Sequence, residues 1–279
     1  MEVVFCGVRG STPAPGPEFV RYGGNTSCVA IGRPGEDPVL VLDAGTGLAR
    51  LTRYIDGRPF RGTILLGHLH WDHTHGLPFF SSGDNPGAKV HIVIPAQGDA
   101  VEVLSRAMSP PHFPVRPDEL RGEWTFESVE PGSFSFEGFD VLVREIPHKG
   151  GRTLGFRVSD GSASLAYLSD HSPQSLGEGP DGYGPYHEAA LDLARGVDLL
   201  IHDSQYTADE FAARADFGHS SIDYTLGLAN EAGVRRLALF HHDPRRTDAE
   251  LDAIVARLEG NVPADIDVFA AAEDVVITL

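Results

Sequence analysis

The 279-residue sequence contains only two cysteines, Cys6 and Cys28, which are too few for a disulfide framework in a chain of this length. Long hydrophobic runs are also missing, because the apolar stretches span 4 to 8 residues, far fewer than the roughly 20 that a membrane span needs. The first residues, MEVVFCGVRG, lack a charged leader and a long apolar stretch. We therefore expect buried free thiols on two early strands, no membrane span, no signal peptide and a cytoplasmic location.

Positive charge is scarce. Lys and Arg number 22 against 40 Asp and Glu, and the formal net charge is -18. Proteins that hold an extended nucleic acid displace its counterions with clustered Lys and Arg. The composition therefore argues against a long polyanionic partner, but it leaves room for a small anion held at a metal ion, whose own charge dominates its surroundings.

The chain also lacks long linkers, low-complexity tracts and internal repeats, so we expect one domain over residues 1–279. Its recurring feature is a short apolar run that ends in an acid or a histidine. Runs of this kind indicate strands buried on both faces, and polar groups just past such strands build the sites of α/β proteins. The five runs end at Asp43, His68, Asp170, Asp203 and His241.

Helix signals lie in the last third of the chain. Thr247 and Glu250 have capping-box spacing at the start of 247–260, and 220–233 has a serine cap and a terminal glycine. In the middle, 124–129, 133–136 and 140–146 are strand-like and are expected to pair antiparallel, and Asp160-Gly161 marks a hairpin. The pattern predicts two sheets with helices on their outer faces. The Gly/Pro-rich segment 172–187 is expected to be a mobile loop beside the site.

The segment HLHWDHTHG, residues 68 to 76, holds four of the 13 histidines and one aspartate. His68 and His70 are expected to lie two apart at a strand end and to point the same way, with Asp72 and His73 folding back after a turn. Neutral imidazoles and carboxylates bind zinc, and iron and manganese tolerate the same set. Because so many ring nitrogens would repel one another when protonated, the cluster predicts a metal site.

HLHWDH resembles the His-x-His-x-Asp-His signature of the metallo-β-lactamase superfamily, and the other landmarks of that superfamily follow in order: Asp43 in LVLDAGTG, His148 in EIPHKG, Asp170 in AYLSD and His241 in LALFHHD. The resemblance implies an α/β fold, a four-layer αβ/βα sandwich of two mixed sheets with helices outside. It also implies two divalent metal ions, first of all Zn²⁺ with Mn²⁺ or Fe as alternatives, in a cleft between the sheet edges.

The resemblance further implies a division of the ligands. One ion would be held by His68, His70 and His148, the other by Asp72, His73 and His241, and Asp170 would bridge them. Two ions about 3.5 to 4 Å apart bring the pKa of a bridging water towards neutrality, and Asp72 could take up its proton. Asp43 would orient a ligating imidazole. His242 competes with His241 for the last position, and alternation with Leu237 and Leu239 favours His241.

The segments GVRGSTPAPGP, YGGNTSC and FGHSS are similar to the tRNase Z-like branch of the superfamily, which implies that His219 acts as a general acid or a phosphate contact. True tRNA-processing enzymes carry a basic Gly/Pro-rich arm, whereas 172–187 contains no Lys or Arg. We therefore expect a phosphodiesterase for small diesters such as cyclic nucleotides, with Tyr183, Tyr186 or His171 near the loop to stack on a base.

Three alternatives stay open at this stage. The same ligand set binds two irons in oxygen-reducing or oxygen-sensing relatives, and tRNA 3′ processing is the activity of the branch's best-known members. The third alternative is a phosphodiesterase or sulfatase that acts on a non-nucleotide ester. The branch also implies a homodimer.

Overall fold

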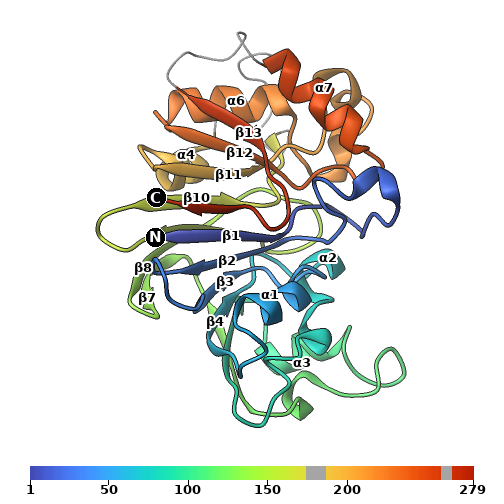
Figure 1. The fold of residues 1–279 in the computed structure, drawn as a ribbon, viewed down its shortest axis with the longest axis vertical. Helices are drawn as coiled ribbons and strands as arrows, with labels where there is room; N and C mark the ends of the chain where they lie inside the picture. Colours follow the sequence, from blue (N-terminus) through green and yellow to red (C-terminus); the bar gives the residue numbers. More distant parts are fainter. Residues whose placement is uncertain (174–186, 259–265) are drawn as a thin grey trace.

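Two seven-stranded sheets lie face to face in the computed structural model, which describes residues 1–173, 187–258 and 266–279 (Figure 1). The first sheet, in spatial order, contains β14 (Val276–Thr278), β1 (Glu2–Gly7), β2 (Cys28–Gly32), β3 (Leu40–Leu42), β4 (Arg61–Leu65), β5 (Lys89–Pro95) and β6 (Glu123–Val129). The second contains β13 (Asp267–Ala270), β12 (Arg236–Phe240), β11 (Leu199–Asp203), β10 (Ser164–Leu168), β9 (Leu154–Ser159), β8 (Phe139–Glu145) and β7 (Gly132–Phe136).

Helices cover the outer face of each sheet, which gives the expected four-layer sandwich. Its helices are α1 (Leu48–Tyr54), α2 (Trp71–Thr74), α3 (Ala100–Ser105), α4 (Glu188–Ala194), α5 (Ala208–Phe211), α6 (Ile222–Glu231) and α7 (Asp248–Leu258). Figure 1 places α1 and α3 on one side of the sheet pair and α4, α6 and α7 on the other. The predicted fold class is confirmed.

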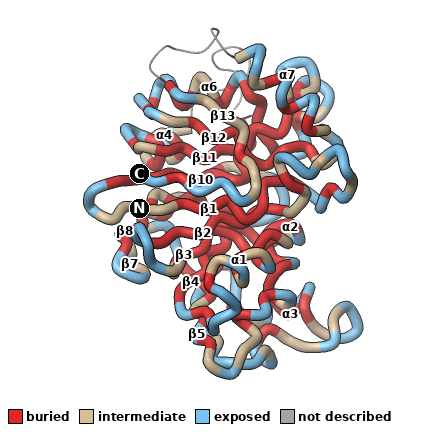
Figure 2. The backbone as a smooth tube through the Cα atoms, in the orientation of Figure 1, coloured by how far each residue is buried: buried red, intermediate tan, exposed pale blue. Residues whose placement is uncertain are grey.

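Three apolar cores separate these layers, and the central strands of both sheets are the most deeply buried part of the chain (Figure 2). In β3, Leu40 and Leu42 point into the core between the sheets, and Val41 points into the core beneath α1. Strands with both faces buried need apolar side chains at every position, which is why these segments lack the polar alternation of a half-exposed strand.

Each sheet contains a run of four parallel strands, and this arrangement positions the site. In the first sheet β3, β4, β5 and β6 are parallel, and in the second β10, β11, β12 and β13 are parallel. Parallel strands end at the same edge of their sheet, so polar residues that follow them gather there.

The expectation of one antiparallel middle region is wrong for segment 124–129. This segment is β6, which pairs parallel with β5 at the edge of the first sheet. The crossover through α3 brings β6 back in the same direction, and the chain then passes at Pro131 into β7 of the other sheet. The antiparallel pairing of β7, β8, β9 and β10 is confirmed, including the hairpin at Asp160-Gly161.

Several local predictions are confirmed. The side chain of Ser221 caps α6 by accepting a hydrogen bond from the Tyr224 N–H, and Thr247 and Glu250 form the capping box of α7. Cys6 and Cys28 are free and buried on β1 and β2. Among the described helices, none is long and apolar enough to cross a bilayer. Most of the expected loop 172–187, with Tyr183 and Tyr186, lies outside the described residues.

Candidate metal centre

The residues expected at the site follow the parallel strands of both sheets. Asp43 follows β3, Asp170 lies two residues past β10, and His241 follows β12. Asp43 and His241 have positive φ values of 60° and 59°, and Ser11, which lines the cleft over the cluster, has a φ of 64°. Backbone strain of this kind gathers at functional sites, where surrounding contacts hold it in place.

His68 and His70 reach the site from an irregular segment, since β4 ends at Leu65. His70 is the N-cap residue of α2, whose single turn carries Asp72 and His73. The rings of His68 and His70 meet edge to face, with centroids 4.4 Å apart. The two residues therefore lie past the strand end that was expected to carry them, but their ligand atoms fall within 4.8 Å of each other, and the turn folds Asp72 and His73 back towards them.

Three of the imidazoles share one orientation: Nδ1 is anchored outward and Nε2 points inward. Nδ1 of His73 donates to Asp43 over 2.7 Å, Nδ1 of His148 donates to the Gly218 carbonyl over 2.6 Å, and Nδ1 of His241 donates to Oε1 of Gln205 over 2.8 Å. Such anchors fix the tautomer that leaves Nε2 free to bind a metal ion.

The inward nitrogens converge on two carboxylates. Asp72 Oδ2 lies 3.2 Å from Nε2 of His73 and 3.1 Å from Nε2 of His241. Asp170 has one oxygen 2.9 Å from His73 Nε2 and the other 3.6 Å from His148 Nε2, so it stands between the two halves of the site.

Ligand atoms from these side chains lie within 4.8 Å of one another in several overlapping groups. Two groups correspond to the expected division, and Asp170 joins a third with His68 and His73. The two groups are His68, His70 and His148, and Asp72, His73 and His241.

The donor set fits divalent ions. Both ring nitrogens of His68, Nε2 of His73 and Oδ2 of Asp170 are buried and have no hydrogen-bond partner among the described residues. Buried polar atoms are normally paired, so these atoms are positioned for a ligand other than protein. Imidazole and carboxylate together are a donor set for zinc and its neighbours.

In the absence of a metal ion, the pKa values of the ligands in the two groups are shifted in different directions. Burial lowers the pKa of His68 well below its usual value, with a smaller contribution from His73. For His241, burial acts to lower the pKa, but Asp170 and the hydrogen bond with Asp72 outweigh it and raise the pKa to about 9. Burial would likewise raise the pKa of Asp72, but His73 and His241 hold it well below its usual value. The carboxylates are therefore charged and ready to bind a cation.

His219 lies at the edge of this cluster, just before α6. Its Nδ1 is 3.0 Å from an oxygen of Asp203 and 3.4 Å from one of Asp170, and its ring stacks on that of His241 with centroids 4.9 Å apart. Asp203 is fully buried at the end of β11 and forms a further group with Asp170, His219 and His241.

Asp203, Ser11 and Gln205 contact the cluster but were not among the predicted site residues. Asp203 could have been predicted from the sequence, because it ends one of the five apolar runs that finish in an acid or a histidine. The backbone N–H of Ser11 donates to Asp72 over 2.6 Å, and Gln205 holds His241. Neither contact could be found from spacing, because each depends on where a loop crosses the sheet edge.

His242 and His171 lie away from the cleft. His242 donates through Nε2 to the Ala271 carbonyl, so the structure brings His241 to the cluster instead. Alternation along β12 does not explain this choice, because the left-handed backbone at His241 turns the chain after Phe240. His171 is fully buried, and its Nδ1 bonds to Nε2 of His202, so its ring is not exposed to stack on a base.

The cleft over the cluster has a volume of about 370 Å³ and is lined by Ser11, Leu69, His70, Trp71, Asp72, His148, Asp170, Phe217 and His219. A family model described as the beta-lactamase superfamily domain matches residues 39–242. The chain belongs to this superfamily. It is a hydrolase of the metallo-β-lactamase fold.

Known proteins similar to this chain extend over almost its whole length. Ribonuclease Z of Synechococcus sp. (strain WH7803) is 26% identical over 289 residues, which cover 88% of this chain and 86% of that protein. The metallo-beta-lactamase fold protein YhfI from Bacillus subtilis matches with a TM-score of 0.73 at 18% identity over 99% of both chains. A diphosphatase from the PhnP family matches with a TM-score of 0.70 at 16% identity, covering 100% of this chain and 97% of that one. These structural matches confirm the fold.

Proposed function

We propose that this chain is a dinuclear metal-dependent hydrolase of small phosphodiesters. The observation that carries the proposal is the convergence of anchored imidazoles, whose inward Nε2 atoms surround Asp72 and Asp170. In this proposal His68, His70 and His148 hold one ion, Asp72, His73 and His241 hold the other, and Asp170 bridges. Two divalent ions at such a site supply charge neutralisation for the phosphoryl group and water activation near neutral pH.

The protein's own groups would move the protons. Asp72 is fixed by the Ser11 N–H and by His241, and it would accept the proton of the attacking water. His219 would protonate the departing ester oxygen, with Asp203 holding its ring through Nδ1. An acid that holds an imidazole through Nδ1 fixes the orientation of the ring.

The cleft favours a substrate with a single phosphate. Its lining contains no Lys or Arg among the described residues, so a second phosphate would find no cationic partner there. The net charge of -18 also repels substrates with several phosphates at longer range. Cyclic nucleotides are the first substrates to test, with Zn²⁺ as the first metal, and a cytoplasmic homodimer remains part of the proposal.

RNA cleavage is the second candidate. The relative from Synechococcus is named Ribonuclease Z and covers 88% of this chain, which counts against the expectation that nucleic acid is not a partner. A di-iron oxygen-binding role is compatible with the same donors. A spectrum of protein purified without added metal distinguishes the di-iron role from hydrolysis, because an iron charge-transfer band in the presence of oxygen indicates the di-iron role.

The test is a substrate screen with zinc and manganese compared side by side. The substrates are bis-p-nitrophenyl phosphate, p-nitrophenyl sulfate, the 2′,3′- and 3′,5′-cyclic nucleotides and a tRNA precursor. We expect metal-dependent turnover of the small diesters, abolished in Asp72→Ala and His70→Ala while circular dichroism shows an intact fold. Full activity in either variant would refute the assignment, and turnover of the tRNA precursor alone would establish the second candidate.

A further inference from the structure

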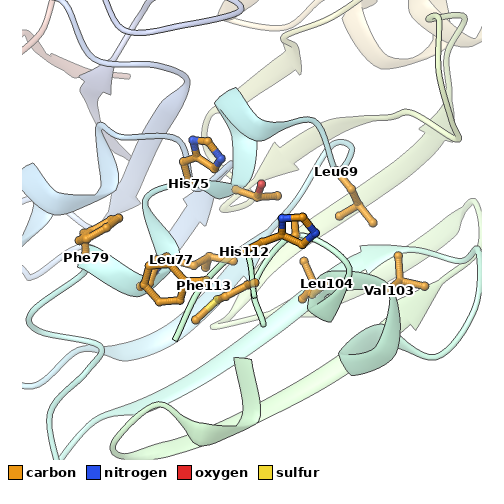
Figure 3. Close-up of a pocket in the computed structure, with 12 residues that line it drawn as sticks. Leu69, His75, Leu77, Phe79, Val103, Leu104, His112 and Phe113 are labelled. Atoms are coloured by element: carbon orange, nitrogen blue, oxygen red, sulfur yellow. The ribbon is translucent and has the colours of Figure 1, made fainter. Parts of the chain in front are cut away.

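An apolar cavity of about 270 Å³ lies next to the candidate metal centre (Figure 3). Its buried wall includes Thr74, Leu77, Leu104 and Met108, and its exposed rim includes Phe79. Leu69 lines both this cavity and the metal cleft. The two spaces therefore share a wall.

Helix α2 joins the two sites. Its first residues carry Asp72 and His73 into the metal cluster, and Thr74, next along the same turn, lines the cavity. Consecutive residues of a helix are separated by about 1.5 Å along its axis. Adjacent residues of this one turn therefore serve the two sites, and Leu69 stands between them.

The chemistry of the cavity is unlike that of the metal cleft. None of the described residues that line it is Asp, Glu, Lys or Arg. The Thr74 hydroxyl donates to the His70 carbonyl over 3.1 Å, and the exposed ring of His75 stacks on Trp71 with centroids 5.6 Å apart. Among the described lining residues, the remaining polar side chains are the exposed imidazoles of His75 and His112, while the inner wall is apolar. A nucleobase in the inner part of the cavity would lose water from its edges and regain few hydrogen bonds, whereas a hydrocarbon group has no hydrogen bonds to lose.

We propose that this cavity is the subsite for one ester group of the substrate, that this group is an apolar ring or hydrocarbon chain, and that diesters with such a group are preferred over the cyclic nucleotides used as first test substrates. The inference rests on the proposed function, because the phosphate must lie at the metal centre for its substituent to reach past Leu69. An apolar cavity of about 150 Å³ holds benzene, so about 270 Å³ accommodates a group larger than one ring.

Product-like phosphonates test the subsite without requiring turnover. Phenylphosphonate and methylphosphonate are titrated calorimetrically into the zinc-loaded protein at a pH where both are dianions. We expect phenylphosphonate to bind at least about tenfold more tightly, because five further carbons leave water. Ala107 is exposed on the wall of the cavity, so Ala107→Trp should fill the space and remove this advantage while methylphosphonate affinity changes less than about twofold.

Matched variants control the experiment. Ala253→Trp adds the same side chain at an exposed position of α7, remote from both sites, and should keep the preference. Ala107→Leu fills less space and should give an intermediate loss, which keeps the test decisive if Ala107→Trp folds poorly.

Each outcome decides a separate point. Equal affinities for the two phosphonates, or a preference that survives Ala107→Trp, would overturn the subsite. Adenosine 5′-phosphate and ribose 5-phosphate are compared in the same way. If the adenosine compound binds more tightly by a similar factor, and Ala107→Trp removes that difference, the cavity accepts a nucleobase and the apolar assignment is wrong. Absence of diester turnover in the wild-type protein, with the phosphonate preference intact, would overturn the proposed function and leave the subsite standing.

Discussion

The carboxylate of Asp43 accepts a 2.7 Å hydrogen bond from Nδ1 of His73, and both side chains are fully buried. Asp43 accepts three further hydrogen bonds, from the Gly67 N–H, the Tyr167 hydroxyl and the Ser169 hydroxyl. A carboxylate held by this many donors cannot rotate away, so His73 has one tautomer and one ring orientation. Asp43 therefore has the geometry of a residue that positions a metal ligand.

Replacing Asp43 with asparagine should weaken metal binding by tenfold to about a hundredfold, which is the usual cost of losing such a partner. The amide keeps the shape of the side chain but removes the charge that faces the His73 N–H. Competition with a chromogenic chelator measures the change, and Asp209→Asn on the exposed surface of α5 is the control. Unchanged affinity in the Asp43 variant would show that His73 does not depend on this anchor.

Metal binding should release protons at neutral pH. In the metal-free protein the pKa of His241 is raised to about 9, and that of His73 is raised well above its usual value, in both cases because nearby carboxylates outweigh burial. Both imidazoles are therefore protonated at pH 7 and must lose that proton to bind a cation. Burial lowers the pKa of His68, His70 and His148, so these three release none.

The corresponding measurement is zinc titration by calorimetry in two buffers with different ionisation heats. The apparent heat should depend on the buffer, and the affinity should rise with pH from neutrality through about 9, where His241 is half titrated. Heats that are independent of the buffer would mean that both imidazoles are already neutral.

Gly10 should be required for the ion expected at His241. A Cβ added at Gly10 would lie 2.3 Å from Nδ1 of His241, and Gln205 holds that ring in place. Gly10→Ala should therefore displace the ring and lower the affinity for one of the two zinc ions by more than about tenfold. The bound metal should fall from two ions per chain towards one. Elemental analysis after dialysis tests this. Gly132→Ala on the edge strand β7, where the nearest atom lies 3.3 Å away, should retain both ions.

The sequence was most informative where the chain is regular. Runs such as that before Asp43 are apolar at every position because both faces of their strands are buried, and the residue after each run falls at a shared edge. The partner of β6 could not be predicted in this way, since an apolar pattern does not specify parallel or antiparallel pairing. The cavity beyond Leu69 could not be predicted either, because part of its wall comes from an irregular segment that includes Ala107 and Phe113, and this segment packs against α2 and α3.

His219→Ala should slow turnover of cyclic nucleotides by about 10²- to 10⁴-fold, the range expected for a lost general acid, and leave the metal content unchanged. The ring is held by Asp203 at the edge of the cluster, and the proposed ligand set is complete without it. The loss should be much smaller with bis-p-nitrophenyl phosphate, because p-nitrophenolate departs without needing a proton. His91→Ala on β5, where the ring pairs with Glu127, is the matched control and should leave turnover of both substrates unchanged. Equal losses on both substrates would instead identify His219 as a phosphate contact, and loss of metal would place it among the ligands.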